Sequence, residues 1–173
     1  MKKTAISRAL TAKSFLLLTF LFFTLTVIAS EDYPEQAFVN QVLSEETPPP
    51  GVIFTVREYD EDALYWVLPR VEKYMLELRQ RFPGLQIAML SHGDELISLS
   101  LSNRHKHKTT HKLLQKLVTQ DNLLFHICGT MAHINGLDPD DFPDYVDVVP
   151  YGPTQIEDYQ SVGFELIDLE LTW

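Results

Sequence analysis

The sequence predicts an α/β protein with a mainly parallel five-stranded sheet and helices on both faces of that sheet. Two observations lead to this class. Short runs rich in apolar and β-branched residues alternate with longer stretches of helical periodicity, an order typical of parallel strands joined by right-handed crossovers. In addition, residues 123–127 form a short, mostly apolar run, as expected of a strand buried on both faces of a parallel sheet.

Two segments precede the predicted domain. Residues 1–29 combine four basic residues, an apolar stretch over 15–28 and a small residue at Ala29, which is the pattern of a cleavable signal peptide. No cysteine lies at the predicted cleavage site directly after that stretch, so we expect export to a periplasm without a lipid anchor. Residues 30–50 are acidic and polar and end in three prolines, which predicts a flexible tether with at most one helical turn. The folded domain is expected to span residues 51–173.

Each element of the domain follows from its local pattern. The predicted strands are runs of apolar or β-branched residues, at positions 52–56, 85–90, 123–127, 146–149 and 164–171. The predicted helices have helical periodicity or a helix-start signal, at positions 63–82, 95–101, 109–119, 130–135 and 152–162. Pro69 predicts either the true first turn of the first helix or a kink in it. Gly136 stands at a natural C-cap position and predicts the end of the fourth helix.

Cys128, the only cysteine in the chain, is the main candidate for a functional residue. It lies where a predicted strand ends and a helix begins, the edge at which open α/β sheets place their ligands. We expect it to be reachable by solvent. Gly129 would leave the sulfur unshielded, and free N–H groups in the turn that begins at Gly129 or Thr130 would favour a thiolate.

Two interpretations of this cysteine remain open. A free cysteine can be a small buried apolar residue, but an exported protein works in an oxidising compartment, which favours a functional role for an unpaired thiol. The candidate roles are sulfur carriage as a persulfide, a redox thiol, or a mixed disulfide with a partner. A dithiol mechanism within one chain is excluded, because the chain has no second cysteine.

Histidines form the other candidate sites. His92 follows the second predicted strand, so it is expected at the same sheet edge as Cys128 and is a candidate binding residue, although it could simply cap the next helix. His107 and His111 are four residues apart, a spacing that metal sites use, and His105 lies nearby. Interleaved lysines would repel a cation, and we predict no resident metal or cofactor. A non-catalytic oligomeric binding module, with His105, His107 and His111 as a candidate metal site, nevertheless remains the alternative function.

The net negative charge of the chain restricts the classes of partner that it can bind. Removing residues 1–29 takes away four basic residues and no acidic one, so the formal net charge changes from −10 to −14. A chain this acidic is not expected to bind nucleic acid or to rest on an anionic membrane. No glycine-rich phosphate loop or dinucleotide fingerprint is present.

The order of these motifs resembles the DsrE/DsrF-like family of sulfur-relay proteins, which includes YchN-like proteins. Residues 125–136, 146–152 and 156–167 carry the resemblance, which covers about residues 51–171. It implies a three-layer α/β/α sandwich and a homo-trimer or hexamer. It also implies that Cys128 carries a persulfide between a donor and an acceptor protein. Two features differ from the family: Asn135 stands where members often have Lys or Arg, and the well-known carriers have no signal peptide.

Overall fold

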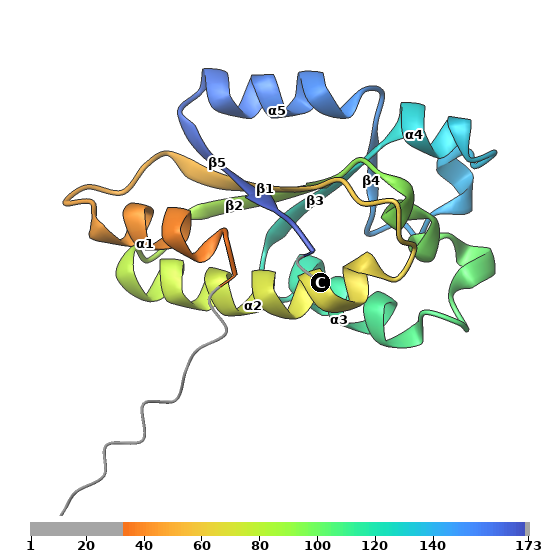
Figure 1. The fold of residues 1–173 in the computed structure, drawn as a ribbon, viewed down its shortest axis with the longest axis horizontal. Helices are drawn as coiled ribbons and strands as arrows, with labels where there is room; N and C mark the ends of the chain where they lie inside the picture. Colours follow the sequence, from red (N-terminus) through yellow and green to blue (C-terminus); the bar gives the residue numbers. More distant parts are fainter. Residues whose placement is uncertain (1–32, 172–173) are drawn as a thin grey trace, which may run out of the picture. The chain divides into compact units, whose positions relative to one another are not determined.

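The computed structural model describes residues 33–171, which form a five-stranded, all-parallel sheet with helices on both faces (Figure 1). This arrangement confirms the predicted α/β/α class. The strands are β1 (Gly51–Val56), β2 (Gln86–Ser91), β3 (Leu123–Cys128), β4 (Asp147–Val149) and β5 (Phe164–Leu169), in the order β4-β3-β2-β1-β5. The α-helices are α1 (Gln36–Ser44), α2 (Ala63–Arg81), α3 (Lys108–Thr119), α4 (Gly129–Ile134) and α5 (Gly152–Ser161).

Three short 3₁₀ turns complete the described chain, at Asp94–Leu99, Leu101–Asn103 and Pro139–Asp141. The first two replace the single short helix expected at residues 95–101. Within residues 33–171, no helix has both the length and the apolar character needed to cross a membrane. The predicted signal peptide, residues 1–29, lies outside the described residues.

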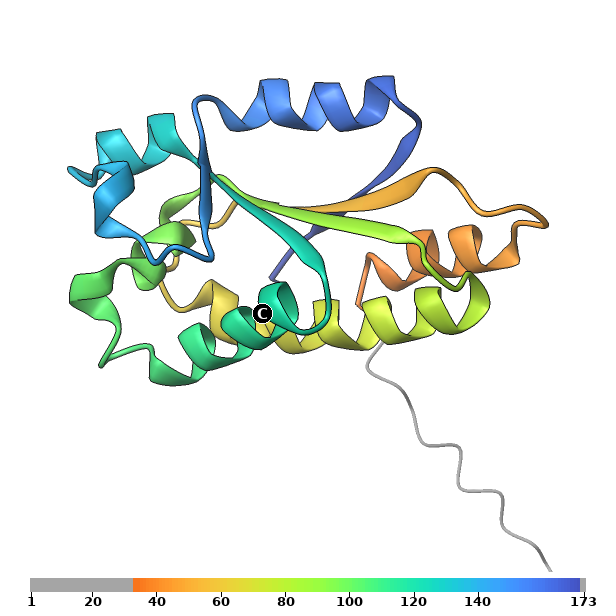
Figure 2. The same cartoon turned by 180° about the vertical axis from the view of Figure 1, so that it is seen from behind.

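The two faces of the sheet are covered unequally (Figures 1 and 2). Helices α1, α2 and α3 cover one face, and α5 covers the other. Alternate residues of a strand point to opposite faces, so Val52, Phe54 and Val56 enter the larger core beneath α2, whereas Ile53 enters a smaller core beneath α5. The apolar periodicity of the strands therefore produces two cores, and a single helix closes the smaller one.

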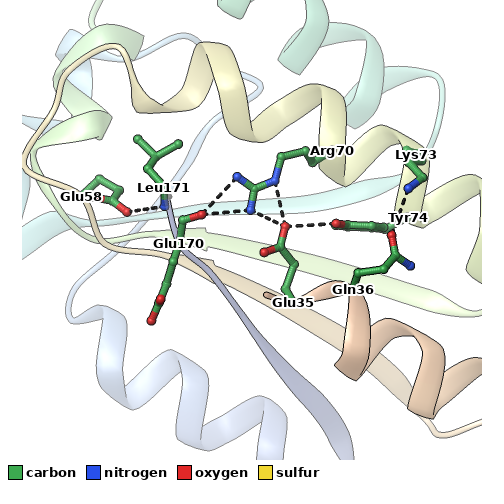
Figure 3. Close-up of polar contacts among 8 residues, drawn as sticks. All are labelled: Glu35, Gln36, Glu58, Arg70, Lys73, Tyr74, Glu170 and Leu171. Carbon is green, nitrogen blue, oxygen red and sulfur yellow. Dashed lines mark hydrogen bonds and ion pairs between the residues drawn. The ribbon is translucent and has the colours of Figure 1, made fainter. Parts of the chain in front are cut away.

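The segment before β1 is not the flexible tether that its composition predicted. Residues 36–44 form α1, whose Val39 and Val42 are buried against the larger core. Just before α1, the buried carboxylate of Glu35 pairs with Arg70 of α2 and accepts a hydrogen bond of 3.1 Å from the hydroxyl of Tyr74 (Figure 3). The acidic composition of this segment did not predict its one buried ion pair or its two buried valines. Together these contacts hold the segment on the domain.

The connections between strands pass from the α2/α3 face of the sheet to the α5 face after β4. The crossovers after β1 and β2 lie on the α2/α3 face, and the connection from β3 to β4 adds Phe142 and Val146 to the same core. Strand β4 then leads into α5 on the opposite face. The carboxyl ends of β3 and β4 are paired through Cys128 and Val149. In open α/β sheets, ligand sites form at such a reversal, so the fold directs attention to Cys128.

Candidate functional site

Cys128 is the last residue of β3 and the N-cap of α4, as predicted, but it is buried rather than solvent-reachable. Only 2% of its surface is exposed. The expectation of an open thiol was wrong because the chain after β4 folds back over the sulfur. Pro150 and Tyr151 in that covering segment are themselves exposed, so the cover is thin.

The hydrogen-bond donor to the sulfur comes from a helix other than the expected one. The N–H of Gly152, the first residue of α5, donates to Sγ of Cys128 at 3.3 Å. The N–H of Thr130 in α4 instead donates to the carbonyl oxygen of Pro150 at 3.2 Å, and its hydroxyl donates to the same oxygen at 3.0 Å. Thr130 therefore secures the covering segment and is not free to bind a ligand at the sulfur.

Glycines at residues 129 and 152 permit this close approach. A Cβ atom at position 129 would lie 2.9 Å from the carbonyl oxygen of Val149, too close for a real side chain. A Cβ atom at position 152 would lie 3.2 Å from the Cβ atoms of both Cys128 and His92. Gly129 thus allows β4 to pass the start of α4, and Gly152 allows α5 to begin directly above the thiol.

The same geometry brings His92 to Cys128, as the sequence predicted. Both side chains start beside Gly152, at the carboxyl ends of β2 and β3. Burial lowers the pKa of His92, and the nearby Arg57 lowers it further, while Asp168 opposes these effects. At neutral pH, His92 is therefore a neutral imidazole that can accept a proton.

A buried carboxylate fixes the loop that carries His92. Glu95 accepts hydrogen bonds from the Ser91 hydroxyl at 2.7 Å, the Gly93 N–H at 2.9 Å and the Glu58 N–H at 2.8 Å. Burial raises the pKa of Glu95, and these three donors oppose that rise. The N–H of His92 itself donates to the carbonyl oxygen of Val56 in β1. The loop is thus tied to β1 on one side and to its own turn on the other.

Asn135 has a structural role in place of the cation often found at this position in the resembling family. Its Nδ2 donates to Asp94 Oδ1 and to the carbonyl oxygen of Met131, each at 3.1 Å. The next residue, Gly136, has a φ of +71°, which confirms the predicted glycine stop after α4. The side chain of Asn135 therefore ties α4 to the turn after His92.

A second polar chain, which the sequence analysis did not identify, lies on the α5 side of the sheet. Nδ1 of His126 lies 2.7 Å from Asp147 Oδ2, and its Nε2 lies 2.7 Å from the Tyr159 hydroxyl. Residues 126 and 147 are opposite each other in the β3–β4 register. Burial and the charge of Asp147 raise the pKa of Tyr159. These hydrogen bonds connect α5, the helix whose N–H donates to Cys128, to β3 and β4. Only knowledge of how β3 pairs with β4 could have predicted them.

The histidine constellation at residues 105–111 does not form a metal site. His111 is buried, with Nδ1 at 2.9 Å from the Tyr145 hydroxyl and Nε2 at 3.1 Å from the Ser98 carbonyl oxygen. Nδ1 of His107 faces Asp62 at 3.3 Å. Across residues 33–171, no three His, Cys, Asp or Glu side chains gather as metal ligands. The two rings instead contact Asp62, Ser98 and Tyr145, none of which lies in an α-helix.

Comparison with solved structures supports the fold. Protein MTH1491 of Methanobacterium thermoautotrophicum, whose function is unknown, aligns with a TM-score of 0.53 at 21% identity, over 68% of this chain and 96% of that chain. Protein BT1422 of Bacteroides thetaiotaomicron, also of unknown function, aligns with a TM-score of 0.49 at 12% identity, over 68% and 94%. The ychN protein of E. coli gives 0.49 at 13% identity, over 69% and 99%. At 21% identity, the likeness to MTH1491 shows the fold alone.

The other comparisons gave no match: no family model and no curated protein matches the chain. Function is therefore inferred from the site itself. Within the described residues, that site combines a covered thiol, a helix N–H directed at the sulfur, and a neutral imidazole.

Proposed function

We propose that the protein is an exported, DsrE/F-like sulfur carrier that holds a sulfur atom as a persulfide on Cys128. The observation that carries this proposal is the hydrogen bond from the Gly152 N–H to Sγ of Cys128 at the reversal of the sheet. A backbone N–H at the start of a helix stabilises negative charge on sulfur, and α5 is ten residues long. Such a donor suits a thiolate or the terminal sulfur of a persulfide.

The reaction balances without a redox cofactor. A sulfane-sulfur donor, such as a persulfide or polysulfide, supplies a neutral sulfur atom. The Cys128 thiolate attacks that sulfur, a new S–S bond forms, and the S–S bond of the donor breaks to release its thiolate. We assign to His92 the role of accepting the thiol proton before the attack, because its side chain starts beside Gly152, as that of Cys128 does, and its lowered pKa leaves it neutral at neutral pH. Delivery to an acceptor thiolate reverses these steps.

The cover over the thiol fits a carrier better than a general redox thiol. With only 2% of its surface exposed, Cys128 is protected from oxidants in solution. Access requires displacement of the short exposed segment around Tyr151. A donor or acceptor protein that contacts this segment would expose the sulfur only when a transfer partner is present.

We further propose a periplasmic location and a homo-oligomer, as a trimer or hexamer. The location rests on the signal-peptide pattern of residues 1–29. Support for assembly comes from the resemblance of residues 51–171 to the DsrE/DsrF-like family, which implies a trimer or hexamer. Light scattering of the processed protein tests the assembly: a strict monomer at tens of micromolar would contradict it.

Sulfur loading tests the carrier function. The processed protein is incubated with a polysulfide and measured by intact-mass spectrometry under non-reducing conditions. We expect the mass to increase by one sulfur atom, reversibly on adding a reductant. Cys128→Ser should show no increase, and His92→Asn should load more slowly at neutral pH. A folded wild-type protein whose Cys128 never gains sulfur would refute the proposal.

A further inference from the structure

A concave site separate from Cys128 lies between α2 and α3, on the face of the sheet opposite α5. This groove has a volume of about 430 Å³, within the usual range for small-molecule sites. Its walls are mainly apolar or aromatic, and include Tyr33, Tyr65, Trp66, Pro69, Thr110 and Leu113. Tyr33 belongs to the segment before α1, so the attachment of that segment to the domain completes the groove.

Two aromatic rings are exposed at its rim. Trp66 is 54% exposed and Tyr65 is 46% exposed, although both lie in the first turns of a helix that buries most of its apolar residues. Their rings meet edge to face, with centroids 4.8 Å apart. A flat apolar molecule can stack on such rings, which adds affinity beyond burial alone.

Pro69 adds a hydrogen-bond acceptor to the groove. Helix α2 continues through this proline, whose nitrogen has no hydrogen. The carbonyl oxygen of Tyr65, four residues earlier, therefore has no donor at the usual helical position. Tyr65 and Pro69 lie on the same face of α2, and both line the groove. An acceptor is thus present beside the aromatic rim.

The charged residues of the groove already have partners. Arg70 pairs with Glu35, and Nζ of Lys73 donates to Gln36 at 2.9 Å and lies 3.8 Å from Glu77. A charged ligand would have to compete with these partners, whereas an uncharged one would leave them in place.

From these three features we propose that the groove binds an uncharged aromatic small molecule that carries one O–H or N–H donor. Its ring stacks on Trp66 and Tyr65, and its donor reaches the Tyr65 carbonyl oxygen. This site is independent of Cys128 and of the sulfur chemistry.

The test compares β-naphthol with its methyl ether, which lacks the donor. Calorimetric titration of the processed protein measures both affinities, and the indole N–H resonance of Trp66, identified with Trp173→Phe, locates the probe. We expect saturable binding that shifts this resonance. The naphthol should bind tighter than the ether by a factor of about 2 to 10, the range for one net hydrogen bond.

Variants separate the contributions. Trp66→Ala should weaken both probes, and Leu76→Ala, which removes another exposed apolar side chain of α2, should weaken neither. Pro69→Ala restores an N–H for the Tyr65 carbonyl oxygen, so it should abolish the preference for naphthol without destabilising the helix. Cys128→Ser should retain binding, which separates this proposal from the carrier function.

Several results would overturn the proposal: equal affinity of naphthol and ether for the wild type, absence of saturable binding, or a preference that persists in Pro69→Ala. Circular dichroism checks the fold of each variant. Tighter binding of a blocked tyrosine peptide than of β-naphthol would assign the groove to a protein partner, and would also overturn the small-molecule proposal.

Discussion

Replacing Arg70 by Met is expected to release α1 from the domain. In the wild type, the Glu35 carboxylate is fully buried, and its Oε1 accepts hydrogen bonds from the Arg70 guanidinium and the Tyr74 hydroxyl. Its Oε2 has no partner among the described residues. Without the guanidinium, a buried charge is left uncompensated, which costs about 3–5 kcal/mol.

This cost is comparable to what holds α1 in place. The buried side chains of Val39 and Val42 contribute about 1.5–3 kcal/mol each. Arg70 also donates to the carbonyl oxygen of Glu170 after β5, and that contact is lost as well (Figure 3). We therefore expect α1 to detach in Arg70→Met before the rest of the domain unfolds.

Urea unfolding combined with limited proteolysis measures this effect. A protease that cleaves after acidic residues should cut Arg70→Met at Glu45 or Glu46 under conditions in which the wild type resists. The matched control is Lys106→Met, which removes an exposed pair with Glu61 that does not contact α1 and should change neither the unfolding midpoint nor the cleavage at Glu45 or Glu46. Replacing Glu35 by Leu together with Arg70→Met should recover most of the loss, because no buried charge remains. Wild-type resistance in Arg70→Met would refute the reasoning.

Three further predictions concern the site and the core. Gly152→Ala should destabilise the domain by about 1–3 kcal/mol in urea unfolding, because the added Cβ lies within 3.2 Å of its neighbours; an unchanged midpoint would contradict the close approach. Tyr159→Phe should cost about 0.5–1.5 kcal/mol, since His126 loses a partner, and an increase in stability would argue against that bond. Burial lowers the pKa of His111 below its usual 6.5, so the unfolded chain binds more protons in the window just below that pH. Stability should therefore fall from about pH 7.5 to about pH 5.5, and fall less in His111→Gln, whereas equal slopes would exclude His111 as a cause.

Local patterns were sufficient to predict most of the fold. The alternation of strands and helices, and the glycine stop at Gly136, depend on neighbours in sequence. Each of the five predicted strands has a counterpart, although β4 and β5 are shorter than expected. The N-terminal segment was misjudged, because the partner of Glu35 lies 35 residues away at Arg70 and no local pattern indicates it.

The site was predicted in part. The strand-end positions of Cys128 and His92 placed them at one edge, and both side chains do lie beside Gly152. The burial of the thiol and the identity of its donor depend on how the chain after β4 folds over β3, which is a tertiary contact. The pairing of His126 with Asp147 depends on strand register in the same way. These features of the site depend on contacts between residues far apart in sequence, so local spacing could not predict them.

The sulfur state of Cys128 in protein isolated from its native source is the decisive measurement for a carrier. The protein is alkylated during lysis, digested without reductant, and the peptide that contains Cys128 is analysed by mass spectrometry. A sulfur carrier should yield a fraction of this peptide with one additional sulfur atom, which a reductant removes before alkylation. Recovery of the peptide solely as the ordinary alkylated thiol, from cells supplied with a sulfane-sulfur source, would contradict the carrier function.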